Sequence, residues 1–208
     1  TENYMGLNGG QIINQDRFGK SRKDGPFGSR QFIGGLAVKP NGLLGMAMTR
    51  ADRFGAKLDN FMHRAVRHMA NMVTISEDQP LRGNRIELSR HRDRYGFPQA
   101  RIVYEISPDA RALWHDGVAE GKEILAAAGA TEIWNGPRGA QHIIGGTLMG
   151  ERPAESVTNK YSQTHDIDNL FVGGAGVFPT ASVANPTFTL HATSMMSAEF
   201  LRDNYDSL

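Results

Sequence analysis

The sequence predicts an α+β fold, with an antiparallel sheet that has helices on one side and with one further strand and helix near the C-terminus. Three stretches alternate apolar and polar residues and are rich in β-branched side chains, as is typical of strands: 72–78, 84–90 and 101–106. The first two are joined by the turn-like QPLRG, so we expect them to be antiparallel neighbours. Residues 169–203 indicate a single strand and a single helix, which must join a sheet whose other strands lie elsewhere.

Residues 1–50 are rich in glycine and lack helical periodicity. Their apolar pieces, QFIGGLAV and LLGMAMT, fit short strands and loops better than a helix. Residues 57–72, by contrast, predict an amphipathic helix with apolar side chains at helical spacing. These side chains are Leu58, Phe61, Met62, Val66 and Met69.

A second helix is predicted over residues 107–130. Ser107 and Pro108 form a typical start, because a serine side chain caps the free N–H groups and proline fits the first turn. An alanine-rich run leads to Gly129, and glycine suits the left-handed conformation in which many helices end.

Composition narrows the class of protein. The 208 residues include 23 basic and 22 acidic side chains, so the net charge of +1 gives no general reason to expect nucleic acid as a partner. There is no cysteine, which excludes disulfides, thiolate metal sites and cysteine nucleophiles. No apolar run approaches the roughly 18 residues that span a bilayer, and the first ten residues lack the layout of a signal peptide. We expect no membrane span, and the location stays open between cytoplasm and periplasm.

The stretch GVFPTASVANPTFT contains the start of the last predicted helix. Asn185 stands at the expected N-cap and Pro186 in the first turn, where its missing N–H is no loss. The residues that follow are apolar on most sides, so we expect this helix to be buried. A buried helix N-terminus, with its partial positive charge and unpaired N–H groups, suits a ligand group that carries or gains negative charge.

His142 lies beside a Gly-Gly turn in QHIIGGTLMG. An isolated histidine there would be interpreted as a packed core residue, but together with the Asn-Pro-Thr helix start it fits the oxidation of an alcohol. That reaction needs a base for the hydroxyl proton, and the ordinary pKa of histidine suits this role near neutral pH. The Asn185 amide can then donate a hydrogen bond to the same oxygen.

The other histidines favour different roles. His191 competes for the role of base, but its place on the last helix indicates a packed residue near the site. His165, in the polar THDID loop, is interpreted as structural. The remaining four are expected to face solvent: His63, His68, His91 and His115. No pair of histidines has ligand spacing with a carboxylate on the same face, so the sequence predicts no metal site.

These segments resemble the C-terminal region of the glucose-methanol-choline (GMC) oxidoreductases. The matching text, in order, is HIIGGTLMG, SVTNKYSQTHDIDNLFVGGAGVFPT and ANPTFTLHATSMMSAEFL. The text EDQPLRGNRIELSRHRDRYGFPQARIVYEI and the alanine-rich helix also resemble the stretch just upstream, so the resemblance covers about residues 70–205. Within the family the chain is most similar to the branch that contains gluconate 2-dehydrogenase, fructose dehydrogenase and pyranose oxidase.

The resemblance implies a function and a set of site residues. GMC enzymes oxidise CH–OH groups by hydride transfer to N5 of FAD, and the implied substrate here is a sugar, glycoside or sugar acid. His142 matches the catalytic base and Asn185 the second active-site residue. The implied FAD contacts are Gly174 and Ala175 in the turn after the strand, and Asn185, Pro186 and Thr187 at the helix start.

The resemblance also implies how the chain is divided. Residues 1–140 would form most of the substrate-binding domain, and residues 141–208 the catalytic segment with the last strand and helix of the FAD-binding α/β domain. The family's G-x-G-x-x-G unit, which holds the ADP part of FAD, has no counterpart in the printed sequence. We therefore expect an N-terminal FAD-binding segment or chain as a partner, and we expect the 208 residues purified alone to be colourless.

Two functions from different classes stay open at this point. The first is an FAD-dependent oxidoreductase with a sugar-like substrate, whose electron acceptor is O2, a quinone or a haem partner. The second is a non-catalytic remnant, or a carbohydrate- or protein-binding module. The missing dinucleotide-binding unit favours the second function, and the presence of both His142 and Asn185 opposes it. The turnover of a His142→Ala variant separates the two.

Overall fold

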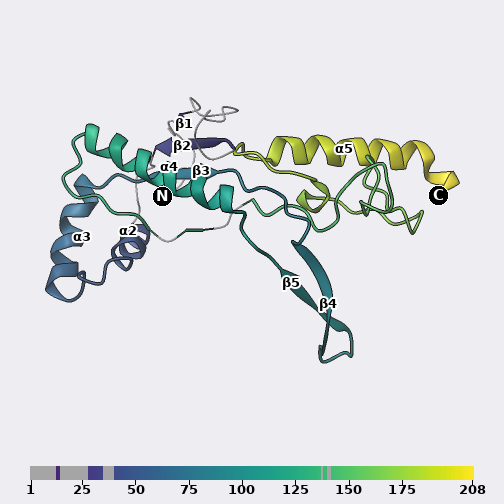
Figure 1. The fold of residues 1–208 in the computed structure, drawn as a ribbon, viewed down its shortest axis with the longest axis horizontal. Helices are drawn as coiled ribbons and strands as arrows, with labels where there is room; N and C mark the ends of the chain where they lie inside the picture. The colour runs from purple at the N-terminus through teal and green to yellow at the C-terminus, as the bar shows by residue number, and fades with distance from the viewer. Residues whose placement is uncertain (1–12, 15–27, 35–39, 137, 140–141) are drawn as a thin grey trace. The chain divides into compact units, whose positions relative to one another are not determined.

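The computed structural model describes residues 13–14, 28–34, 40–136, 138–139 and 142–208 (Figure 1). The chain divides into two units that alternate along the sequence. Unit 1 consists of Thr1–Ser76 and Arg111–Gly139, and unit 2 of Glu77–Ala110 and Ala140–Leu208. The elements are β1 (Ile13–Asn14), β2 (Arg30–Gly34), α2 (Pro40–Ala47), α3 (Ala56–His68), β3 (Met72–Ser76), β4 (Arg85–Arg92), β5 (Pro98–Val103), α4 (Pro108–Ala127), η1 (Ala175–Val177), α5 (Thr187–Asn204) and η2 (Tyr205–Ser207). Helices and small antiparallel sheets agree with the predicted α+β class.

Unit 1 contains a three-stranded antiparallel sheet in the order β1-β2-β3, with α4 packed against it. Two glycines of α4 allow the helix to come close. A Cβ atom on Gly117 would lie 2.6 Å from Thr74 Cγ2 of β3. One on Gly121 would lie 3.2 Å from Cε of Met72, the first residue of the same strand. Because glycine carries no side chain, the helix backbone can lie directly on the strand.

A buried ion-pair cluster joins this sheet to the same helix. Arg30 of β2 is only 3% exposed, and its guanidinium pairs with both Asp116 and Glu120 of α4. A buried charge is costly unless it is paired, so the two carboxylates compensate for the burial of the arginine.

The helices α2 and α3 share a small apolar core. Its buried members are Leu43, Ala47, Phe61 and Ala65, with Leu58, Met62, Met69 and Trp134 packed around them. The predicted helix over 57–72 is thus confirmed as α3, although Val66 is 64% exposed instead of facing the core. The expectation of strands and loops for LLGMAMT was wrong, because Leu43 and Ala47, four residues apart, form one face of a helix against α3. The piece QFIGGLAV forms β2 up to Gly34, and its last four residues lie outside the described part of the chain.

The predicted pairing of strands 72–78 and 84–90 was also wrong. β3 pairs with β2, and β4 pairs with β5 in a separate two-stranded sheet of unit 2. A tight turn explains the choice, since the Asp93 N–H donates to the Phe97 carbonyl and the Asp93 carboxylate accepts the N–H groups of Tyr95 and Phe97. This turn brings β5 directly back along β4, and the predicted strand over 101–106 is found three residues earlier, as β5.

The β4–β5 hairpin (Figure 1) carries different side chains on its two faces. Ile86 lies opposite Ile102 on one face, and both side chains are exposed, at 60% and 74%. On the other face Glu87 lies opposite Arg101, and the two side chains form an ion pair at 3.8 Å. The hairpin thus carries an apolar face and a charged face, as expected from the two-residue period of a strand.

Helix α4 confirms the predicted helix over 107–130 at both ends. The Ser107 Oγ accepts the Ala110 N–H at 2.9 Å, which caps the first turn. At the other end Gly129 has φ 89°, and the Ala130 N–H donates to the Leu125 carbonyl. This bond, across a glycine in the left-handed region, is the usual way in which a helix is closed.

Helix α5 was predicted to be buried, and in this structure it is not. None of its side chains is buried, Phe188 is 91% exposed and Met195 is 65% exposed. One stripe of the helix packs on the loop that precedes it, where the ring of Phe200 stacks on Tyr161 at 4.2 Å. The predicted strand near residue 169 is reduced to one bridge, between Gln163 and Phe171. An apolar helix and strand need packing partners on every side to be buried. The described residues supply such partners on one side only.

Among the helices of the described residues, none combines the length and the apolar character that a bilayer span requires.

Candidate active site

Two glycine-rich segments that are distant in sequence lie side by side in unit 2. Three hydrogen bonds join them: Gly145 N–H to the Ala175 carbonyl at 3.1 Å, Thr147 N–H to Gly176 at 3.0 Å, and Met149 N–H to Val177 at 2.8 Å. The first segment follows His142, and the second is the turn that was predicted to contact FAD. The fold therefore brings together two of the motifs that the sequence singled out.

The backbones approach closely at the middle of this contact. A Cβ atom on Gly176 would lie 2.8 Å from Thr147 Oγ1, which is shorter than such atoms tolerate. Gly145 has φ 82°, in the left-handed region that favours glycine. Strand β4 reaches the same turn, since a Cβ atom on Gly146 would lie 3.2 Å from Ile86 Cδ1. Gly146, Gly176 and Thr147 thus form the tightest part of this contact.

His142 has an exposed side chain and an unusual backbone conformation. Its φ is 56°, and among the described residues other than glycine only Ser162 shares a positive φ. Residues with a side chain seldom adopt this conformation, and such positions cluster at functional sites. The observation singles out His142 on grounds that are independent of the sequence motif.

The start of α5 differs from the prediction by one residue. The helix begins at Thr187 with Pro186 as N-cap, and the Pro186 carbonyl accepts the Leu190 N–H at 2.9 Å. Asn185 was predicted as the N-cap, but it precedes that position, and proline with φ −82° takes it instead. The Asn185 side chain is exposed, and it forms no hydrogen bond with any residue that the structure describes.

The predicted site residues are therefore only partly assembled. Ala175 accepts a hydrogen bond from Gly145 in the His142 segment, and Gly174, with φ 90°, immediately precedes it. Within the described part of the chain no hydrogen bond joins His142 to Asn185. The contact of Thr147 with Gly176 was not predicted from the sequence. Two glycine-rich segments of similar length, GGTLM and GGAGV, were the signal that could have revealed it.

A polar loop before the Gly174–Ala175 turn packs against α5 and holds it in place. The Asn159 carboxamide oxygen accepts the N–H groups of Tyr161 and Gln163, and the Gln163 amide donates to the Asp168 carbonyl at 2.7 Å. These bonds present the Tyr161 ring to Phe200, where the two rings lie nearly parallel, at 9°. The loop and α5 thus form one packed piece of unit 2.

The remaining histidines mostly follow their predictions. His165 is half-buried, and its Nε2 lies 2.9 Å from Ser156 Oγ, in agreement with a structural role. His191 was expected to be packed, but it is exposed because α5 is covered on one side only. The four histidines expected to face solvent do so: His63, His68, His91 and His115.

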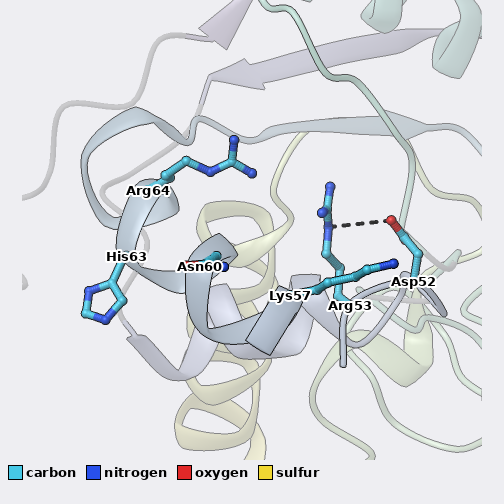
Figure 2. Close-up of a pocket in the computed structure, with 6 residues that line it drawn as sticks. All are labelled: Asp52, Arg53, Lys57, Asn60, His63 and Arg64. Atoms are coloured by element: carbon cyan, nitrogen blue, oxygen red, sulfur yellow. Dashed lines mark ion pairs between the residues drawn. The ribbon is translucent and has the colours of Figure 1, made fainter. Parts of the chain in front are cut away.

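Unit 1 has an open hollow of about 630 Å³ near the start of α3 (Figure 2). It is lined by Asp52, Arg53, Lys57, Asn60, His63 and Arg64. Arg53 pairs with Asp52 and with Glu132, and its guanidinium lies 5.3 Å from the centre of the Phe61 ring. Hydrogen bonding to Arg50 lowers the pKa of Asp52. Neither His142 nor Asn185 is among the residues that line this hollow.

Comparison with known proteins gives a consistent result. The sequence profile of the family described as GMC oxidoreductase matches residues 80–194, more than half of the chain. The fructose dehydrogenase large subunit of Gluconobacter japonicus is 31% identical over 183 residues, which cover 85% of this chain and 34% of that protein. The gluconate 2-dehydrogenase flavoprotein of Pantoea cypripedii is 25% identical over 225 residues, with 99% and 36% covered. Pyranose 2-oxidase of Tricholoma matsutake is 45% identical over 60 residues, with 29% and 11% covered.

The class of protein that these matches define is that of the oxidoreductases. The chain belongs to the GMC oxidoreductase family. The similarity to fructose dehydrogenase, gluconate 2-dehydrogenase and pyranose oxidase, inferred from the motifs, is confirmed. The chain spans about a third of the length of the first two of these relatives.

Proposed function

We propose that the protein oxidises a hydroxyl group of a sugar, glycoside or sugar acid, with FAD as hydride acceptor and His142 as base. The observation that carries the proposal is the hydrogen-bonded pairing of the His142 segment with the turn at Gly174 and Ala175. A base and a hydride acceptor must meet at one substrate carbon, and a catalytic advantage comes from holding them there.

The turn suits a flat cofactor. A Cβ atom on Gly173 or Gly174 would meet no described atom within 4 Å, so the backbone there is open to a ring system. The first N–H groups of α5, beginning at Thr187, have no partner within the helix and suit a group that gains negative charge. Bound between these elements, FAD would supply the acceptor for the hydride that leaves the substrate carbon.

Two side chains of this chain would act on the substrate. His142 would take the hydroxyl proton on an imidazole nitrogen while the C–H bond breaks, so that the alcohol becomes a carbonyl. Asn185 would donate an amide N–H to the same oxygen as its negative charge develops. Both side chains are exposed, as groups that must reach a substrate need to be.

The rest of the assembly follows the same proposal. Residues 1–140 would supply most of the substrate-binding domain, and residues 141–208 the catalytic segment and the last part of an FAD-binding domain. An N-terminal FAD-binding segment or chain would hold the ADP part of the cofactor, and O2, a quinone or a haem partner would reoxidise it. The names of the relatives refer to fructose, gluconate and pyranose, which supports a sugar-like substrate.

The test is a replacement of His142 by a residue that can adopt the same backbone conformation. His142→Asn is the sharpest choice, because asparagine tolerates the left-handed conformation found at this position. In flavin-loaded protein expressed from its complete gene, this variant should lose about 10²–10⁴-fold in kcat and keep the flavin absorption spectrum. The matched control is His63→Asn on α3, whose side chain is 81% exposed and which should leave kcat unchanged.

Two results would contradict the proposal. Turnover by His142→Asn at the wild-type rate would show that His142 is not the base. A wild-type protein that neither binds flavin nor oxidises any sugar-like alcohol would instead support the non-catalytic binding module.

A further inference from the structure

The contact between Thr147 and Gly176 has a feature that hydrogen bonding alone does not explain. The backbone bond from the Thr147 N–H to the Gly176 carbonyl, at 3.0 Å, is of ordinary length. The Thr147 hydroxyl, however, stands where a side chain at position 176 would have to lie, 2.8 Å from that Cβ position. The hydroxyl and the bare glycine therefore fit together as a matched pair.

We propose that Thr147 and Gly176 are positioning residues, which set the distance between the segment that carries His142 and the turn that faces FAD. The inference rests on the proposed function, since it assigns these residues a role in that reaction. Neither residue touches the reacting atoms. Thr147 lies five residues after His142, and Gly176 directly follows Ala175, so the contact links the base segment to the cofactor segment.

The expected displacement follows from the contact distance. Ordinary van der Waals contact of a Cβ atom begins near 3.4 Å, so an alanine at 176 would have to move the segments apart by about 0.6 Å, from 2.8 to 3.4 Å. Rotation of the threonine side chain gives little relief, because β-branched residues are restricted at χ1. Misplacement of a catalytic group by about 1 Å can cost about 10²-fold in rate.

The geometry also limits how the strain can be relieved. Gly176 is followed by Val177, which is only 1% exposed and whose carbonyl accepts the Met149 N–H. On the other side, the Ala175 carbonyl holds the Gly145 N–H. The contact thus lies between two further hydrogen bonds of the same pairing, and a shift at its centre must disturb at least one of them.

The experiment is a mutant cycle in flavin-loaded protein expressed from its complete gene. Gly176→Ala should lower kcat by about 10²-fold, with KM nearly unchanged because substrate binding itself is not altered. It should also lower the Tm by roughly 2–10 °C, as overpacking does. Adding Thr147→Ala, which removes the opposing hydroxyl, should restore most of both losses. Adding Thr147→Val, which keeps the bulk, should not.

A control variant, measured by both kcat and Tm, separates a local steric effect from the general effect of replacing a glycine by alanine. Gly83→Ala, also in unit 2, places its Cβ where no described atom lies within 4 Å, and it should leave kcat and Tm unchanged. If Gly176→Ala behaves like Gly83→Ala, or if Thr147→Ala gives no rescue, the proposal is overturned.

Two further outcomes separate this inference from the proposed function. Gly176→Ala could lower the Tm, and Thr147→Ala could restore it, while kcat stays at the wild-type value throughout. That result would show that the contact only stabilises the fold and would overturn the positioning role. A wild-type protein that has no flavin-dependent turnover would overturn the proposed function itself. In that case the Tm cycle would still report whether the two residues are sterically coupled.

Discussion

Replacement of Gly117 by alanine should destabilise unit 1, because α4 meets the sheet at this residue. The added Cβ would lie 2.6 Å from Thr74 Cγ2, so helix or strand must move by about 0.8 Å to reach ordinary contact at 3.4 Å. Overpacking of this kind costs about 1–3 kcal/mol. Alanine gains up to about 1 kcal/mol over glycine in a helix, so the free energy of unfolding should fall by up to about 2 kcal/mol.

Three further variants isolate the steric cause. Gly45→Ala in α2 adds a Cβ that meets no described atom within 4 Å, so it should show only the helix-propensity gain. It should exceed Gly117→Ala in stability by about 1–3 kcal/mol. Gly121→Ala should lie between them, since its Cβ meets the mobile end of Met72 at 3.2 Å. Adding Thr74→Ser, which removes the clashing methyl group, should return Gly117→Ala to near the stability of Gly45→Ala.

Tryptophan fluorescence in urea is the suitable assay. The chain has two tryptophans, Trp114 and Trp134, and both belong to unit 1, so the signal follows the unit that contains the mutations. With a slope of about 2 kcal/mol per molar urea, a difference of about 2 kcal/mol separates two midpoints by about 1 M. Equal midpoints for Gly117→Ala and Gly45→Ala would refute the steric reasoning.

Three other predictions concern a helix cap, a ring stack and an ion pair. Ser107→Ala should lower the free energy of unfolding by about 1 kcal/mol, because the Ser107 Oγ caps the first turn of α4 at 2.9 Å. The control is Ser107→Asp, which can still cap the helix. Equal urea midpoints for the two variants would contradict the prediction. A double-mutant cycle on Tyr161 and Phe200 should give a coupling of about 0.5–1.5 kcal/mol from their stack at 4.2 Å, and a coupling near zero would show that the stack adds nothing beyond burial. Arg50→Ala should raise the pKa of Asp52, which hydrogen bonding to Arg50 now lowers, and NMR titration of the carboxyl group measures the change. A carboxylate whose pKa is lowered by folding stabilises the protein above its unfolded pKa, and this contribution is lost as the pH falls through the lowered pKa; an unchanged pKa in Arg50→Ala would exclude Arg50 as the cause.

Helix α4 could be predicted from the sequence because its signals are local. Ser107 caps the first turn and Gly129 closes the last, and both act within a few residues of their own position. The strand pairing could not be predicted in the same way. β3 pairs with β2, which lies about 40 residues earlier in the chain, and nothing within 72–90 indicates that distant partner. The tight turn at Asp93, which closes β4 on β5, was the local signal that went unused.

In the candidate site too, local features could be predicted from the sequence and long-range contacts could not. His142 could be identified from its motif, and its left-handed backbone agrees with a special role. The pairing of its segment with Ala175 depends on a contact across about 30 residues, and the sequence indicates it only through the glycine content of both segments. The exposure of Phe188 on α5 could not be predicted either, because burial depends on the neighbours of a helix and its own apolar composition does not supply them.

The interleaving of the two units affects the order in which the chain can fold. The ion pairs of Arg30 with Asp116 and Glu120 join residues that are 86 and 90 positions apart, so the β2–α4 contact of unit 1 cannot form before α4 is made. The β4–β5 hairpin lies between these partners, and its contacts are local. During synthesis the hairpin can form before α4 is available to pack on β2 and β3, because short-range contacts cost less loop-closure entropy and form faster. The buried arginine would stay without its carboxylates during that interval.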